Sequence, residues 1–139
     1  MKSLILITLL SLISCLSINV SDENKKLTNQ FISNELNGKW NIVQMNQEKG
    51  KVGTFEFNQN SISVNVGCNG IGSSYEIKPK QKIKFEQAMS TMMYCNEESN
   101  KKEQIIGLLI PKLIRYQFIK DNILKLETEN GKEFLILEK

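Results

Sequence analysis

The chain has 139 residues, of which 18 are basic, 15 are acidic and none is histidine, giving a formal net charge of +3. This nearly neutral balance argues against nucleic acid or another polyanion as the partner. Without histidine, the chain lacks the residues for Ser-His-Asp or Cys-His catalysis and for a histidine-ligated metal site. It also has no Gly-rich phosphate loop, so we expect no metal, no cofactor and no catalytic residues.

The N-terminus has the pattern of an export signal. A lysine precedes an apolar run over residues 4–13, which is too short for a membrane-spanning helix of about 20 apolar residues. The sequence Leu12–Cys15 resembles the bacterial lipobox, in which the signal is removed just before a cysteine that becomes lipidated. We therefore predict a lipoprotein signal over residues 1–14 and a membrane anchor on Cys15. An ordinary signal cut nearby, with Cys15 incidental, is the alternative.

A tether and a single domain are expected to follow. Residues 15–35 are rich in Ser, Asn and Lys and have no clear hydrophobic period, which is typical of a tether. Within them, Leu27, Phe31 and Ile32 indicate a short helix that leads into the domain. Residues 36–139 have enough apolar content for one hydrophobic core.

Alternation of apolar and polar residues predicts a series of short strands in this domain. The clearest spans residues 61–66, with apolar residues on one face and polar residues on the other. In the first strand, Trp40, Ile42 and Gln44 are expected on one face and Met45 on the other. Further strands are expected around residues 54–57, 74–78, 83–86, 116–118, 124–126 and 134–137.

The period changes after Cys95 and predicts one helix. Asn100 and Glu103 have the spacing of a capping box, which indicates a helix start at Asn100, and Pro111 should end or kink the helix. Its apolar stripe is expected at Ile105, Leu108 and Leu109, widened by Ile106 and Ile110. Because strands dominate and no βαβ pattern occurs, we predict an α+β fold. It has a curved antiparallel sheet of about 7–8 strands with one main helix packed on it.

Cys68 and Cys95 lie at the two ends of the central stretch of the domain. The strand alternation over residues 61–66 continues to Cys68 and predicts that its side chain points toward the core. An exported chain with two domain cysteines favours a disulfide, which would close a loop of about 28 residues. Buried reduced thiols are the alternative. A redox pair would be unusual without Cys-x-x-Cys spacing, and a catalytic cysteine would lack a histidine base.

Four motifs occur in a fixed order along the domain: Gly38-Lys39-Trp40, Gly67-Cys68-Asn69, Gly72 to Tyr75, and Thr91 to Cys95. With them, residues 36–139 resemble the META domain, the HslJ-like family of bacterial envelope proteins. The chain departs from the family pattern at Met92, where the family usually has Lys or Arg. Any role of the family that depends on a positive charge at this position is therefore not expected of this chain.

The resemblance implies a compact antiparallel sheet with a helix against it and a role in the cell envelope. The family is linked loosely with heat-shock response, drug tolerance and virulence, and it has no accepted catalytic activity. Its motif residues have structural interpretations. Trp40 is expected to anchor the core, and Gly67 and Gly70 to allow a bend at Cys68. Asn69 is expected to bond its own backbone in that bend. The motif residues expected to have such structural roles are Gly38, Trp40, Gly67, Asn69, Gly72, Tyr75, Thr91 and Met93.

The sequence leaves three classes of function open. The first is a non-enzymatic envelope protein, anchored by a lipid on Cys15, with a structural role or a role in binding a protein or a small ligand. The second is a small inhibitor or ligand carrier that binds through the concave sheet or through an adaptable apolar loop, although ordinary packing is the simpler expectation for the loop methionines. The third is an enzyme using Glu97 and Glu98, which are more simply explained as solvated acids at a helix start. The loop residues are Met89, Met92, Met93 and Tyr94.

Overall fold

A computed structural model describes residues 20–139 as a β-barrel with two α-helices. The helices are α1 (Val20–Leu36) and α2 (Glu97–Leu109), and a short 3-10 helix, η1 (Ile110–Lys112), follows α2. The strands are β1 (Gly38–Met45), β2 (Glu48–Asn58), β3 (Ser61–Asn65), β4 (Gly70–Lys78), β5 (Lys82–Phe85), β6 (Met89–Ser90), β7 (Arg115–Lys120), β8 (Ile123–Glu127) and β9 (Phe134–Glu138).

The strands form a closed antiparallel ring in the order β3-β2-β1-β9-β8-β7-β5-β4, which β3 and β4 complete by pairing with each other. The short β6 adds to β4 outside this ring. The predicted curved sheet is therefore wrong in one respect, since the sheet closes into a barrel. Closure needs pairings between strands remote in the sequence, such as β1 with β9. One of them, β5 with β7, is held by the single pair Lys82 and Arg115.

The core fills the interior of the barrel. Residues that alternate along the strands point inward, as Ile62 and Val64 do in β3, and Trp40 is fully buried. The Trp40 indole Nε1 donates a hydrogen bond of 2.7 Å to the carbonyl oxygen of Leu36 at the end of α1. This bond satisfies the polar atom of the largest core side chain, as buried polar groups require.

The first strand differs from its predicted alternation. A bulge between Ile42 and Gln44 shifts the register of β1 against both of its neighbours. Because a bulge adds one residue to one strand, the side chains beyond it change faces. Met45 is consequently buried, whereas Gln44 is partly exposed and donates to the carbonyl oxygen of Asn46.

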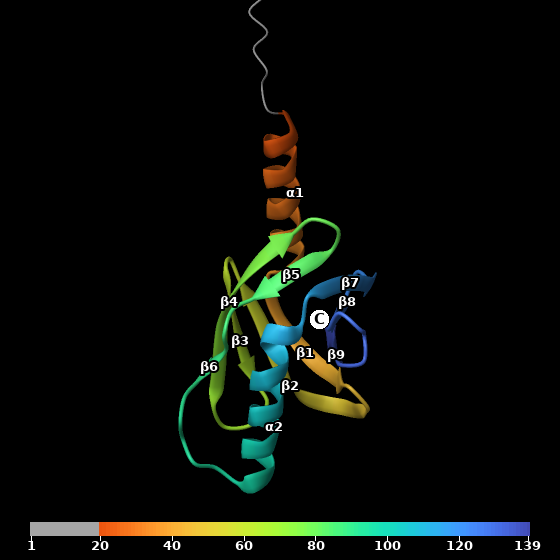
Figure 1. The fold of residues 1–139 in the computed structure, drawn as a ribbon. Helices are drawn as coiled ribbons and strands as arrows, with labels where there is room; N and C mark the ends of the chain where they lie inside the picture. The colour runs from red at the N-terminus through yellow and green to blue at the C-terminus, as the bar shows by residue number, and fades with distance from the viewer. Residues whose placement is uncertain (1–19) are drawn as a thin grey trace, which may run out of the picture.

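Two helices flank the barrel: α2, where the main helix is predicted, and α1, where a short helix is expected. In Figure 1, α1 projects beyond one end of the strands, and α2 lies at the opposite end. α1 covers most of the predicted tether and is longer than the short helix expected there; its last residue, Leu36, is buried while Leu27 and Phe31 are exposed. Neither helix in residues 20–139 is both long and apolar enough to cross a bilayer.

α2 starts four residues earlier than predicted, with Asn96 rather than Asn100 as its N-cap, and is rotated. The Asn96 side chain caps it by accepting from the Ser99 backbone N–H at 2.8 Å, so Asn100 lies inside the helix. Ile106 and Leu109 are buried, but Ile105 and Leu108 are exposed, which shifts the buried face by about one residue. The rotation places Glu103, a charged residue, on the buried face. Pro111 lies in η1, where the α-helix has already ended.

Candidate functional site

Three segments meet at the end of the barrel that α2 covers. The loop after β3 contains Cys68 and Asn69, the segment after β6 runs to Cys95, and α2 begins directly afterwards. Cys68 and Cys95 form a disulfide with their Cα atoms 6.3 Å apart, in agreement with the preferred interpretation of the sequence. The bond ties the first segment to the second, next to the start of α2.

Asn69 connects the same segments through hydrogen bonds. Its side-chain oxygen accepts from the Thr91 hydroxyl at 2.9 Å and from the Met93 backbone N–H at 2.8 Å. Its Nδ2 donates to the Met93 carbonyl at 2.9 Å and to Glu103 Oε2 at 2.7 Å. All four bonds that an Asn side chain can make are therefore formed. The expectation that Asn69 would bond its own backbone is wrong, because these remote partners use its whole capacity.

Glu103 holds the loop from the other side. Its Oε1 accepts from the backbone N–H groups of Cys68 at 2.6 Å and of Asn69 at 2.7 Å. Burial raises the pKa of Glu103. Hydrogen bonds from the Asn69 side chain and from the Asn69 and Cys68 backbone outweigh burial, so the net pKa lies below the usual 4.5. The carboxylate is therefore ionised at neutral pH and acts as an acceptor for three N–H groups.

Sequence reasoning missed this role of Glu103. The capping-box spacing from Asn100 predicts that Glu103 lies in the first turn of the helix, but the helix begins at Glu97. A useful signal was its spacing from Ile106 and Leu109, since residues three and six positions apart fall near one helix face. An acid on the apolar face of a helix indicates a buried polar contact.

Gly67 has a different role from the one predicted. Its φ is not in the left-handed region, so the bend does not require a glycine for that reason. A Cβ atom at Gly67 would lie 2.8 Å from the Ser99 Cβ and 2.9 Å from Glu103 Oε1. The glycine is therefore needed because α2 approaches the loop closely. Gly70, by contrast, has open space where its Cβ would be.

The segment between β4 and α2 exposes an unusual number of apolar side chains. We call residues 89–94 the methionine loop. Thr91 holds its base, since the Gly70 N–H donates to the Thr91 hydroxyl at 3.2 Å and the Thr91 N–H donates to the Gly70 carbonyl at 3.1 Å. The exposed fractions are 75% for Met89, 98% for Met92, 58% for Met93 and 92% for Tyr94. The expectation of ordinary packing for these methionines is therefore wrong.

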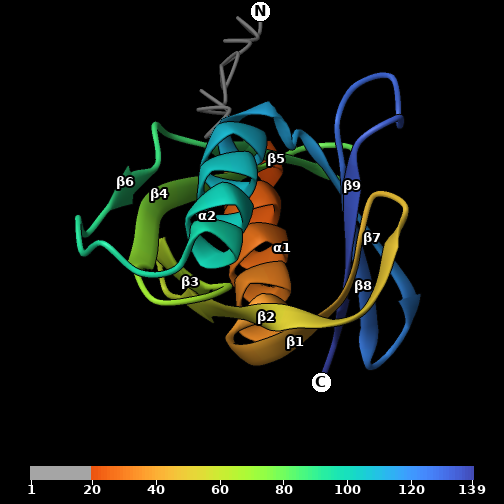
Figure 2. The same ribbon diagram turned by 90° about the horizontal axis from the view of Figure 1, so that it is seen from below.

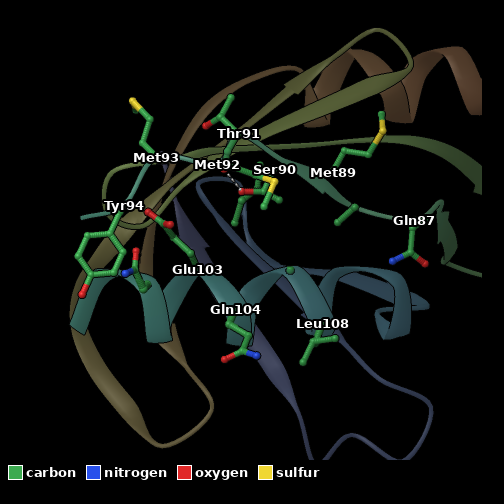
Figure 3. A pocket seen from close by; sticks show the side chains of 14 residues that line it. Gln87, Met89, Ser90, Thr91, Met92, Met93, Tyr94, Glu103, Gln104 and Leu108 are labelled. Carbon is green, nitrogen blue, oxygen red and sulfur yellow. Dashed lines mark hydrogen bonds between the residues drawn. The ribbon is translucent and has the colours of Figure 1, made fainter. Parts of the chain in front are cut away.

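A groove of about 590 Å³ lies between the methionine loop and one face of α2. In Figure 3, Glu103 projects from α2 toward the loop, whereas the Gln104 and Leu108 side chains project from the helix on the side away from the loop. Ile71 and Ala88 also contribute to the lining. Among the described residues that line the groove, Glu103 is the only acidic residue and none is basic.

The other predicted site residues do not line the groove, or lie outside the described residues. Gly38 has a φ of +109°, which favours glycine, at the turn between α1 and β1. Tyr75 is buried in the barrel, whereas Gly72 is the third residue of β4 and pairs with Met89, which lines the groove. Glu97 and Glu98 are exposed in the first turn of α2, where Glu98 pairs with Lys102 at 2.9 Å. The predicted lipidation site, Cys15, lies outside the described residues.

Comparison with known proteins places most of the chain in one family. The META domain model matches residues 33–139. An NMR structure of a protein from Burkholderia xenovorans is 18% identical, with a TM-score of 0.60 over 79% of this chain and 87% of that chain. A DUF4847 family protein from Bacteroides vulgatus is 12% identical, with a TM-score of 0.55 over 75% and 93%. At these identities the similarity shows the fold alone. No curated protein matches the chain.

Proposed function

Because the chain belongs to the META domain family, we propose that it is a non-enzymatic binding protein of the cell envelope, held at the membrane by a lipid on Cys15. The methionine loop and the adjacent face of α2 form its binding surface. The lipobox-like sequence supports the anchor, and the stress-response and drug-tolerance links of the family make such conditions the ones in which to look for a phenotype.

One observation supports the binding role above all: Met92 and Tyr94 are almost fully exposed on a loop whose backbone is held in place. A disulfide just after the loop, three hydrogen bonds of the Asn69 side chain to Thr91 and Met93, and the pairing of β6 with β4 hold this loop. Exposed methionine and aromatic side chains are typical of adaptable contact surfaces. An already ordered loop also loses less conformational entropy when it binds.

The Glu103 carboxylate supports a non-enzymatic role. Three N–H groups bind it and lower its pKa, whereas a general acid near neutral pH needs a raised pKa. Glu97 and Glu98 extend into solvent at the start of α2 and do not line the groove. The described part of the chain also contains no cluster of three or more His, Cys, Asp or Glu residues suited to a metal ion.

A crosslinking experiment in native membranes tests the binding role. The full-length lipoprotein is compared with a Met92→Ser/Tyr94→Ser variant, and captured proteins are quantified by mass spectrometry. A Leu27→Ser/Phe31→Ser variant is the matched control, because these α1 residues are also exposed and apolar. We expect one partner to be lost at least tenfold from the loop variant and retained in the control. Equal capture by all three proteins would refute the loop as the binding surface.

The anchor is tested separately by mass spectrometry of the mature N-terminus. A lipidated Cys15 is the expected species, and an unmodified terminus at another residue would refute the anchor.

The second candidate function is inhibition of an envelope hydrolase, which the protruding, ordered methionine loop favours. It is distinguished by the identity of the captured partner. The purified domain would then reduce the activity of that hydrolase, and the loop variant would not.

A further inference from the structure

The groove beside the methionine loop combines apolar walls with one buried negative charge. Glu103 is 7% exposed and belongs to the groove lining. Its partners are two backbone N–H groups and one amide, all of which are neutral. None of the ion pairs found within residues 20–139 involves Glu103. The carboxylate is therefore held by hydrogen bonds, but its charge is not neutralised.

Such a charge attracts a cation more strongly than a surface carboxylate does, because the surrounding protein screens it less than water. The nearest basic residue along α2, Lys102, is already engaged with Glu98 at 2.9 Å and Glu48 at 3.6 Å. Lys101 is the other neighbouring cation in the sequence, and it is exposed and does not line the groove. The charge of the groove is thus complementary to a positively charged ligand.

The side chains that line the groove determine which uncharged groups of a ligand would fit. Met89, Met93 and Leu108 belong to the lining of the groove. Figure 3 shows the Met89 and Met93 side chains turned away from α2, and flexible thioether side chains can turn to fit ligands of different shape. Tyr94 is 92% exposed at one end, where its ring can stack on a cation or an aromatic group. A volume of about 590 Å³ lies within the usual range for small-molecule sites.

We propose that this groove binds a small lipophilic cation, with the positive charge near Glu103 and the apolar body against the methionines and Leu108. The proposal rests on the proposed function, since it assigns a ligand class to the same surface. A basic side chain of a partner protein is the alternative source of the cation. The size of the groove favours the small molecule.

Two probe ions of the same shape and opposite charge test the proposal. Tetraphenylphosphonium and tetraphenylborate are titrated, as chloride and sodium salts, into the disulfide-bonded protein carrying ¹³C-methyl methionine. We expect tetraphenylphosphonium to shift the methyl signals of Met89, Met92 and Met93, while buried Met45 serves as an internal reference. Tetraphenylborate should bind at least tenfold more weakly. Equal or tighter binding of the anion, or no shift with the cation, would overturn the proposal.

Two variants locate the charge and the aromatic contact. Glu103→Gln keeps the side-chain shape and should weaken tetraphenylphosphonium binding at least tenfold, whereas Glu98→Gln, which lies outside the groove, should leave it unchanged. Tyr94→Ser alters only an exposed side chain and should weaken binding threefold or more. Unchanged binding in both Glu103→Gln and Tyr94→Ser would refute the site. If Glu103→Gln does not fold, Tyr94→Ser and the comparison of the two ions decide.

The result is independent of the crosslinking test. If a partner is lost from the Met92→Ser/Tyr94→Ser variant but tetraphenylphosphonium does not bind, the binding role stands and the ligand class is wrong. If the cation binds but no partner depends on the loop, the groove is a ligand site and the proposed protein contact is wrong. If a captured partner competes with tetraphenylphosphonium, its own cationic side chain occupies the groove, which would overturn the small-molecule assignment.

Discussion

Replacing Glu103 by Ala should strongly destabilise the domain. The substitution removes three hydrogen bonds, of 2.6, 2.7 and 2.7 Å, to an ionised carboxylate. Each such bond contributes about 1.5–3 kcal/mol net, and a buried donor left without a partner costs about 1–3 kcal/mol. The three bonds share one acceptor group and water can reach Cys68, so they do not add fully. We therefore expect a loss of about 3–4 kcal/mol.

The assay is urea unfolding of the oxidised protein at pH 7, followed by tryptophan fluorescence and circular dichroism. Glu97→Ala is the matched control, because this exposed acid six residues earlier should change the free energy of unfolding by less than about 0.5 kcal/mol. A loss below about 1 kcal/mol for Glu103→Ala would show that the loop does not depend on this carboxylate.

The same contact predicts a pH dependence. The folded-state pKa of Glu103 is below its usual 4.5, so in acid the unfolded chain binds a proton more readily than the folded chain does. The stabilisation is fully present above about pH 4.5 and is lost as the pH falls through the lowered pKa. The difference in unfolding free energy between wild type and Glu103→Gln should therefore shrink below pH 4.5. A difference that stays constant down to acid unfolding would contradict this assignment.

Three further predictions concern the rest of the fold, and each is measured as a change in the free energy of unfolding. Gly67→Ala should cost about 1–3 kcal/mol through its contacts with α2, whereas Gly70→Ala should be neutral; equal effects would contradict the close approach. Cys68→Ser with Cys95→Ser should cost about 3.5 kcal/mol, and a negligible loss would argue against a stabilising disulfide. Trp40→Phe should cost about 2 kcal/mol, and a change below about 0.5 kcal/mol would show that the indole hydrogen bond is dispensable.

The parts of the fold that follow from local pattern could be predicted from the sequence. Alternation of apolar residues identifies β3, because a half-buried strand must place every second side chain inward. The predicted export signal and the two domain cysteines indicated the disulfide between Cys68 and Cys95, which the structure contains. The ordered motifs indicated the META domain, which the family match over residues 33–139 confirms.

The parts that depend on long-range contacts could not be predicted. The bulge in β1 adds one residue and has no recognisable pattern in the sequence. It nevertheless places Met45 in the core, where simple alternation predicts Gln44. Closure of the barrel depends on β3 meeting β4 and β5 meeting β7, which short-range alternation does not specify. The rotation of α2 follows from the bonds of Glu103 to the loop after β3, 34 and 35 residues earlier in the chain. Apolar periodicity alone predicts a buried face of α2 that is displaced by about one residue from the observed face.

Glu103 has two consequences that deletion alone cannot separate. Its hydrogen bonds order the loop that presents Met92 and Tyr94, and its charge gives the groove a preference for cations. Removing the side chain would abolish binding in either case, whether through a disordered loop or through a missing charge. Comparison of two ions of identical shape on the unaltered protein isolates the charge, because the loop is the same in both titrations. A strong preference for the cation would therefore assign the charge a role in binding beyond its role in folding.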